Sequence, residues 1–261
     1  MLNLNPFFVL EDDPRPIPKS RLQVVRAASL VFSSLKFVSD LRRGVMRPDM
    51  GRRNTRLCMS QFFRLFSTAR IANSGCNDCI QVDEQATHVA VLCRGQFYYF
   101  DALWPTGQVA ISEVELARNF VAILEDSRSL NAVGCAMGAV GVLTAEDRDQ
   151  WGRCRTKLAA LHPKNKKVLH IIDSALFVVC LDDCEPETLD DRAANMLHGS
   201  YDLVERTDAH EGLLQTGTLC NRWYDKLQLI ICANGAAGIN FEHSAVDGPF
   251  LLCCVMWLVL R

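Results

Sequence analysis

Residues 227–243 constrain the fold more than any other segment, because they have the pattern of two strands joined by a tight turn. Leu227 to Cys232 is an apolar run of strand character, and Asn234-Gly235 follows it. An Asn-Gly pair suits a two-residue hairpin turn, whose central residues both need positive φ. The return strand, from Gly238 to Glu242, then leads into His243. The segment therefore predicts a hairpin that places one imidazole at the sheet edge, where a cleft could form.

His243 is a candidate general base. A free imidazole has a pKa of about 6.5, so histidine side chains in general can take up a proton near pH 7 and return it. A carboxylate, Asp247, stands four residues later, and Gly248 follows it. Most single histidines are surface or core residues without chemistry, so this short motif by itself leaves both interpretations open.

Length and composition fit a globular α/β protein and exclude some partners. The 261 residues allow one large or two small domains, and the 49% of apolar residues can build a sizeable core. The formal net charge of -2 gives no indication of nucleic acid or an anionic membrane as a partner. An apolar tail at residues 250–260 is shorter than the roughly 20 residues that a transmembrane helix needs.

Twelve cysteines without a secretory signal indicate a reducing compartment. We expect an intracellular protein, in the cytoplasm first and in a mitochondrion or peroxisome as alternatives. Three of the cysteines, Cys93, Cys180 and Cys232, lie in apolar strand-like runs and should behave as small buried hydrophobes.

Cys76 and Cys79 form a C-x-x-C motif, for which we expect no metal. Zinc needs a second pair of ligands at suitable spacing. Cys180 and Cys184 are the nearest candidates, but they fall on a strand end and in a loop. No thioredoxin-like βαβ pattern surrounds the motif, so a redox disulfide is equally unsupported there.

The rest of the chain alternates between helical and strand-like patterns, with a hairpin-like turn at Arg94-Gly95-Gln96. This alternation predicts an α/β fold with a mixed sheet flanked by helices. Expected helices cover residues 21–43, 58–70, 112–127, 144–161 and 185–197, the third with Ser112 and the fourth with Thr144 as N-cap. Expected strands cover residues 89–93, 97–100, 140–143, 168–173 and 175–181. Residues 44–56, 73–83 and 201–220 are expected to be loops or a surface excursion.

The segment that precedes the hairpin carries a resemblance to a known family. Together, NRWYDKLQLIICANGAAGINFEHSAVDG (residues 221–248) resembles the carnitine/choline acyltransferases, in which an N-R-W-[FY]-D-K segment leads into two strands and the catalytic histidine. Further blocks resemble the family in the same order from Asn5 to Gly248: NPFFVLEDDP with RAASLVFSSLKF, LCMSQFFRLFSTARI, HVAVLCRGQFYYFDAL, AVGVLTAEDRDQW and ALFVVCLDD. The amino-acid sequences of these blocks are most similar to a fungal carnitine O-acetyltransferase-like branch of the family.

The resemblance implies a CoA-dependent acyltransferase-like domain that moves an acyl group reversibly between the CoA thiol and the carnitine hydroxyl. Family members have two similar α/β domains with the active-site tunnel between them. We therefore interpret residues 1–248 as part of the first, histidine-bearing domain. The second domain, with the residues that bind CoA and carnitine, matches nothing here. No permanently bound cofactor is implied, and acyl-CoA and carnitine would be substrates.

The apolar residues 249–261 depart from the family pattern. Our hypothesis is that the reading frame or a splice boundary changes near Gly248. Transcript reads that join the codons of Gly248 and Pro249 would contradict it.

The resemblance also assigns roles to residues. His243 matches the catalytic histidine, and Asp247 matches an acidic position that usually organises the loop through an ion pair. Glu242 could orient the histidine, but its place on the opposite face of a strand points it away. Scaffold roles for the hairpin fall to Asn221, Arg222 and Asp225, with Trp223 and Tyr224 packed beneath it.

Two functions of different class follow. The first is a carnitine O-acyltransferase for acetyl or short acyl chains, with His243 as general acid and base. The second is a catalytically incompetent fragment that keeps the histidine but cannot bind substrates, since catalysis needs both reactants positioned together. A choline acyltransferase is a less favoured third.

Overall fold

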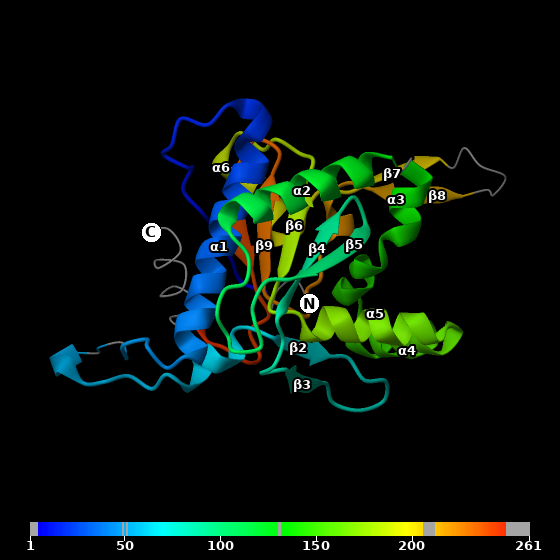
Figure 1. Cartoon of the computed structure of the whole chain (residues 1–261). Coiled ribbons are helices and arrows are strands. Elements are labelled where there is room, and N and C mark those ends of the chain that lie inside the picture. Colours follow the sequence, from blue (N-terminus) through cyan, green and yellow to red (C-terminus); the bar gives the residue numbers. More distant parts are fainter. Residues whose placement is uncertain (1–4, 49, 51, 130–131, 206–211, 249–261) are drawn as a thin grey trace.

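A six-stranded mixed sheet forms the centre of the protein (Figure 1). The computed structural model describes residues 5–48, 50, 52–129, 132–205 and 212–248. The strands lie in the order β1-β10-β9-β6-β4-β5; the inner strands β4, β6 and β9 are parallel, and every other neighbouring pair is antiparallel. Their bounds are β1 Phe7–Val9, β4 His88–Cys93, β5 Gln96–Asp101, β6 Val178–Asp182, β9 Gln228–Cys232 and β10 Ala237–Asn240.

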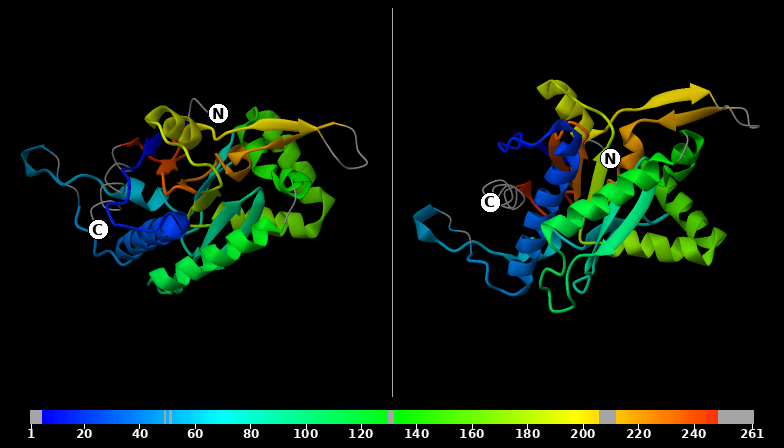
Figure 2. Two further views of the ribbon diagram at one scale, coloured as in Figure 1. Left: turned by 90° about the horizontal axis from the view of Figure 1, so that it is seen from above. Right: turned by 45° about the horizontal axis from the view of Figure 1, so that its top comes forward.

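Helices cover both faces of this sheet (Figures 1 and 2). Alternate side chains of β4 enter two separate apolar clusters. Val89 and Val91 pack with α1 and α2, whereas Ala90 and Leu92 pack with α4, α5 and α6. The helix bounds are α1 Leu22–Arg42, α2 Glu113–Arg128, α3 Ala132–Gly138, α4 Arg148–Leu161, α5 Pro163–Ser174 and α6 Leu189–Leu197. The predicted class, α/β with a mixed sheet flanked by helices, is confirmed.

Helix α1 is a core helix of this sheet. Within the described residues, the segment Lys19–Arg42 alone has the length and hydropathy to cross a membrane. Yet Ala27, Val31 and Leu35 are fully buried against the sheet and α2. Burial of this face in the protein accounts for its apolar composition.

The hairpin of β9 and β10 forms as predicted, but its turn and its place differ. Gly235 has φ 83°, its N–H donates to Cys232 O at 2.9 Å, and Cys232 N donates to Ala236 O at 2.8 Å. This is a three-residue loop with glycine in the left-handed position, and Asn234 does not need positive φ. The sheet edge is also occupied, because β1 pairs with the outer side of β10.

Three predicted elements are wrong because an apolar pattern alone does not decide their structure. Residues 140–143 form a 3₁₀ turn (Val140–Ala145), in which a Cβ at Gly141 would lie 2.2 Å from the carbonyl oxygen of Arg222. Residues 168–173 belong to α5, which Pro163 opens at its first position. Residues 58–70 form a short 3₁₀ helix (Ser60–Arg64) and then strand β2.

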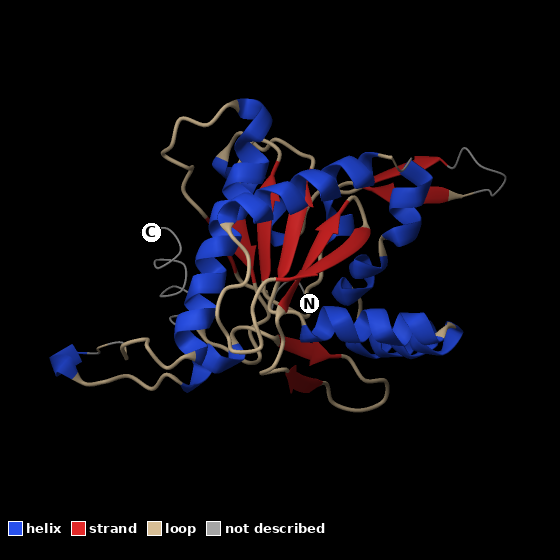
Figure 3. Cartoon of the chain, in the orientation of Figure 1, coloured by secondary structure: helices blue, strands red, loops and turns tan. Residues whose placement is uncertain are grey.

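Two small ladders occupy segments that were expected to be helix, loop or surface excursion. β2 (Thr68–Ile71) pairs with β3 (Cys79–Val82), and this ladder lies below the main sheet in the view of Figure 1. β7 (Asp202–Glu205) pairs with β8 (Leu213–Thr216), and Figure 3 shows this hairpin projecting from the body.

The helix caps were predicted with mixed success. Ser112 caps α2 in a complete capping box with Glu115. Helix α4 is capped by Asp147 and not by Thr144. The Thr144 hydroxyl is buried, donates to Gly141 O and accepts from Tyr224 N at 2.9 Å. It ties the 3₁₀ turn to the segment before β9.

Candidate active site

His243 is the first exposed residue after a well-anchored strand end. Phe241 is buried, its ring stacks on Phe8 with centroids 6.3 Å apart, and its N–H donates to Pro6 O at 3.1 Å. The His243 ring packs against the Phe241 ring at 5.7 Å. The imidazole side chain itself is 44% exposed. The sheet thus holds the backbone while the ring faces solvent.

Asp247 lies beside the imidazole. His243 Nε2 and Asp247 Oδ1 are 3.5 Å apart, and the Asp247 side chain is 65% exposed. The backbone N–H of Asp247 donates to Gln61 Oε1 at 2.8 Å, and its carboxylate accepts from Gly248 N at 2.8 Å. The residue therefore shapes its own loop as well as facing the ring, and water screens the pair.

Glu242 turns away from His243 into the body of the protein. Its side chain is 7% exposed and accepts from Arg70 Nη1 at 3.3 Å. It also accepts from the backbone N–H of Ser244 at 2.9 Å and from the Ser244 hydroxyl at 2.5 Å. The Glu242 carboxylate thus bridges over His243 to the next residue, Ser244, and ties this turn to Arg70 of β2, which fixes the path of the loop.

A chain of ion pairs connects Glu242 to Asp225. Arg70 and Arg148 both bind Asp78 Oδ2, at 2.7 and 2.6 Å. Arg148 continues to Asp225 Oδ1 at 2.7 Å, and Trp151 Nε1 donates to Asp225 Oδ2 at 2.8 Å. Burial raises the pKa of Asp225 to about 6, against the opposing pull of Arg148 and Trp151. Asp225 and the loop that carries His243 (residues 242–248, the histidine loop) are thereby one connected unit.

Arg222 lies at the centre of a second, fully buried network. Its two terminal nitrogens donate to the two carboxylate oxygens of Asp182 at 3.0 and 2.7 Å, and both side chains are 0% exposed. The same guanidinium donates to Thr218 O and Asn195 O. Burial lowers the pKa of Arg222, whereas the ion pair and hydrogen bonds with Asp182 raise it, and the net result is a raised pKa.

Asn221 joins this network to the sheet. Its Nδ2 donates to Leu181 O at 3.2 Å and Asp182 Oδ1 at 3.1 Å, and its Oδ1 accepts from Gly95 N at 3.0 Å. Trp223 and Tyr224 are fully buried beside it. The rings of Trp223 and Trp151 meet edge to face at 5.8 Å.

Sequence reasoning missed Arg70, Asp78 and Arg148 of the first network and Asp182 of the second. It recognised the segment that contains Lys226 but gave this lysine no role. Lys226 is fully buried, and its Nζ donates to Asp173 O at 2.6 Å and Thr68 O at 3.0 Å. Desolvation lowers the pKa of Lys226 to about 7. One sequence signal could have indicated the buried charges: Asp182 follows, and Lys226 precedes, an apolar strand-like run.

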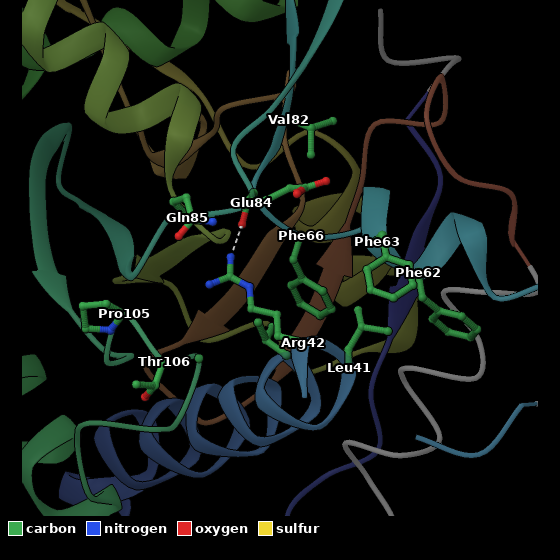
Figure 4. Close-up of a pocket in the computed structure, with 13 residues that line it drawn as sticks. Leu41, Arg42, Phe62, Phe63, Phe66, Val82, Glu84, Gln85, Pro105 and Thr106 are labelled. Atoms are coloured by element: carbon green, nitrogen blue, oxygen red, sulfur yellow. Dashed lines mark hydrogen bonds between the residues drawn. The ribbon is translucent and has the colours of Figure 1, made fainter. Parts of the chain in front are cut away.

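A cavity of about 370 Å³ lies near the end of α1. Figure 4 shows Phe66 beside the Arg42 side chain, with Phe62 and Phe63 on one side of the cavity and Pro105 and Thr106 on the other. Arg42 donates to Ala86 O at 2.6 Å and Ser67 Oγ at 3.1 Å. His243 does not line the cavity, although Gln61, which precedes the lining residue Phe62 in sequence, accepts from the backbone N–H of Asp247.

One group among the described residues has the donor types of a metal site. Asp182, Cys184 and Cys232 have ligand atoms within 4.8 Å of one another. Asp182 already accepts from Arg222, Asn221 and Asn195. A carboxylate saturated by donors and paired with a buried guanidinium is a poor cation ligand. The absence of a metal stays a prediction.

The whole chain resembles one protein family. Residues 1–260 match the family described as Choline/Carnitine o-acyltransferase. The chain is 41% identical over 271 residues to the "Putative mitochondrial carnitine O-acetyltransferase" of Saccharomyces cerevisiae, and 31% identical over 283 residues to the human "Carnitine O-palmitoyltransferase 2, mitochondrial". Each match covers 97% of this chain and 39% of the relative. A "Choline O-acetyltransferase" of Drosophila melanogaster is 33% identical over 75% of this chain and 28% of that protein.

Proposed function

Because the chain belongs to the choline/carnitine O-acyltransferase family, we propose that it supplies the proton-transfer residue of a carnitine O-acyltransferase. The proposed reaction moves an acyl group between the CoA thiol and the carnitine hydroxyl, with CoA and acyl-CoA as substrates and no resident cofactor. The name of the yeast relative supports acetyl as the acyl group. The chain spans 39% of the relatives' length, so the activity of the whole protein is part of the proposal.

The proposed role of His243 follows from the weak nucleophilicity of both acceptors in their protonated forms. The imidazole takes the proton from the carnitine hydroxyl as its oxygen attacks the thioester carbonyl. The tetrahedral intermediate then collapses, and the imidazolium returns the proton to the departing CoA sulfur. The same steps run backwards with the thiol as nucleophile, so one residue serves both directions.

The position of His243 at the end of β10 is the observation that supports this role most strongly. The stacking of Phe8 on Phe241 and the bonds of Glu242 to Arg70 and Ser244 hold the loop on both sides of the imidazole. The ring itself is 44% exposed and can reach a substrate. A general base needs this combination of a fixed backbone and an accessible nitrogen.

The exposure of the His243 ring favours a second candidate function, a catalytically incompetent member of the family that cannot bind the substrates. The described residues leave one side of the imidazole open to solvent, whereas acyl transfer requires both substrates to be held at it. A choline acceptor is less favoured, because that relative matches over a smaller part of the chain.

An acetyl-transfer assay with acetyl-CoA and L-carnitine tests the proposal, following release of the CoA thiol. We expect His243→Gln to lower the rate by about 10²- to 10⁴-fold, the usual contribution of a general base. The matched control is His162→Gln, an exposed histidine that caps α5 and lies far from this loop in sequence. Equal rates for the two variants would refute the role of His243. No transfer and no CoA binding by the unaltered protein would support the second candidate.

We also propose a mitochondrial location. The yeast and human relatives are named as mitochondrial, and these names give the expected cytoplasmic location no support. A fluorescent fusion of the protein should overlap a mitochondrial marker, and a diffuse cytoplasmic signal would contradict this.

A further inference from the structure

We propose that Cys184 and Cys232 are a modification site, at which a mild oxidant such as hydrogen peroxide forms a reversible intramolecular disulfide. Their Sγ atoms lie 3.8 Å apart, although the residues are 48 positions apart in sequence. Cys232 is the last residue of β9, and Cys184 follows the end of β6. The pair lies at the end of the sheet opposite to His243 and takes no part in the proposed proton transfer.

The backbone already holds the two cysteines side by side. Strands β6 and β9 are parallel neighbours in which Asp182 pairs with Cys232, and the N–H of Ala233 donates to Cys184 O at 3.0 Å. A disulfide needs the two sulfurs about 2.05 Å apart. Side-chain rotation can supply most of the remaining approach, so the strands need not separate.

The two thiols differ in access. Cys184 is half-buried and lines a hollow of about 570 Å³ with Thr188, Asn195 and His198 at the side of α6. Cys232 is fully buried. The hydrogen bond shared with Cys184, together with burial, raises the pKa of the Cys232 thiol. Peroxide therefore meets Cys184 first, and Cys232 is positioned to resolve the product.

The chemistry balances with peroxide as the only oxidant. The Cys184 thiolate attacks one peroxide oxygen, which breaks the O–O bond and gives a sulfenic acid and hydroxide. The Cys232 sulfur then attacks the Cys184 sulfur and displaces the sulfenic hydroxyl, which leaves as water with the Cys232 proton. Two thiols lose two electrons and two protons in total, and one peroxide becomes two waters. A dithiol reductant reverses the change.

Four other thiols of the described residues have different surroundings. Cys180 is fully buried, and its Sγ faces Gln228 Oε1 at 3.6 Å. Cys93 is buried beside the Ser127 hydroxyl at 3.2 Å. Cys76 and Cys79 are exposed, and Cys79 Sγ accepts from Asn73 Nδ2 at 3.7 Å. The motif that the sequence singles out is therefore not the pair that the fold places in contact.

Peptide mapping of the folded protein tests the proposal. The folded protein is treated with one equivalent of hydrogen peroxide. It is then unfolded in guanidinium chloride so that buried thiols also react, alkylated with iodoacetamide, and digested without reduction. Cleavage before Asp183 separates Cys180 from Cys184, and fragmentation distinguishes Cys232 from the later cysteines. We expect a cross-linked peptide lighter by about 2 Da than the sum of its reduced halves. It should disappear with dithiothreitol.

Variants make the assignment specific. Cys184 is half-buried, so the variant Cys184→Ser should fold, and it must lose the cross-link. The control variant Cys180→Ala must keep the cross-link. The cross-link should also raise the melting temperature of the oxidised protein by roughly 5–10 °C, since it restricts the unfolded chain. The proposal is overturned if Cys184 stays alkylatable, if it ends as a sulfinic acid, or if Cys232 remains protected from alkylation in oxidised Cys184→Ser.

Discussion

The surroundings of Arg222 and of His243 lie close in sequence but use charge in opposite ways. Arg222 and Asp182 are 0% exposed, and the two terminal guanidinium nitrogens and the carboxylate all have hydrogen-bond partners on several elements. His243 and Asp247 are 44% and 65% exposed and meet at 3.5 Å. A buried charge pair fixes which elements pack together, whereas an exposed pair leaves its groups free to exchange protons. Within residues 221–248, Arg222 therefore has a structural role, and His243 is the candidate for proton transfer.

Different contacts hold these two regions to the rest of the protein. Arg222 holds the β6 end and α6 through Asp182 and Asn195. The histidine loop is held through Glu242 and Arg70, and from there through Asp78 and Arg148 to Asp225. Damage to the first region should lower stability, and damage to the second should lower activity.

The largest expected effect is on stability, from Arg222→Met. It leaves the Asp182 carboxylate buried without its cation, which typically costs about 3–5 kcal/mol of unfolding free energy. Urea denaturation measures the loss. The matched control is Arg192→Met, whose pair with the 66% exposed Asp12 should contribute about 1 kcal/mol or less. Similar losses in the two variants would remove the contrast between buried and exposed charge.

Lys226 extends the comparison to pH. Its folded pKa is lowered to about 7 from an ordinary 10.5, so between these values the unfolded chain binds more protons than the folded one. Stability should therefore rise with pH from about 7 to 10, by up to about 1.4 kcal/mol per pH unit. Below pH 7 both states bind the proton, so Lys226 adds no pH dependence there and its destabilising effect is constant.

Lys226→Met should abolish that rise, and the difference between the two pH profiles cancels the titration of cysteines and tyrosines. Urea denaturation at pH 7, 8 and 9 gives both profiles. Parallel profiles would mean that the ammonium stays charged inside the protein, held by the carbonyl oxygens of Thr68 and Asp173.

Arg70 tests the connection between the two regions. Arg70→Met removes the cation between Asp78 and Glu242, both of which are mostly buried, and should cost about 1–2 kcal/mol of stability. If Glu242 fixes the histidine loop, the acetyl-transfer rate should fall about tenfold at saturating substrate. Arg153→Met, at an exposed pair, is the control. A loss of stability without loss of rate would make the ion-pair chain purely structural.

The sequence predicted what depends on local patterns. The hairpin of β9 and β10, helix α1 and the capping box at Ser112 all follow from short periodicities or fixed spacings. Segments whose state is decided by tertiary contact were mispredicted. Val140 to Leu143 is apolar enough for a strand, but Gly141 packs against the Arg222 carbonyl and the chain coils into a 3₁₀ turn.

The site shows the same limit. His243, Asp247 and the N-R-W-Y-D-K segment could be selected because they are close in sequence. The partners of Glu242 and Asp225 could not, since Arg70, Asp78 and Arg148 come from β2, the β2–β3 loop and α4. Likewise, no spacing rule brings Cys184 to Cys232, whereas the parallel pairing of β6 and β9 does.

The smallest expected effect distinguishes two roles for Asp247. Because the pair with His243 is exposed and 3.5 Å long, Asp247→Asn should change stability by less than about 1 kcal/mol. The asparagine Oδ1 can still accept from Gly248 N, so the loop keeps its shape. If Asp247 only organises the loop, the acetyl-transfer rate should fall less than about tenfold. A fall that approaches that of His243→Gln would instead make the carboxylate a partner of the imidazolium, since the amide keeps the hydrogen bond but loses the charge.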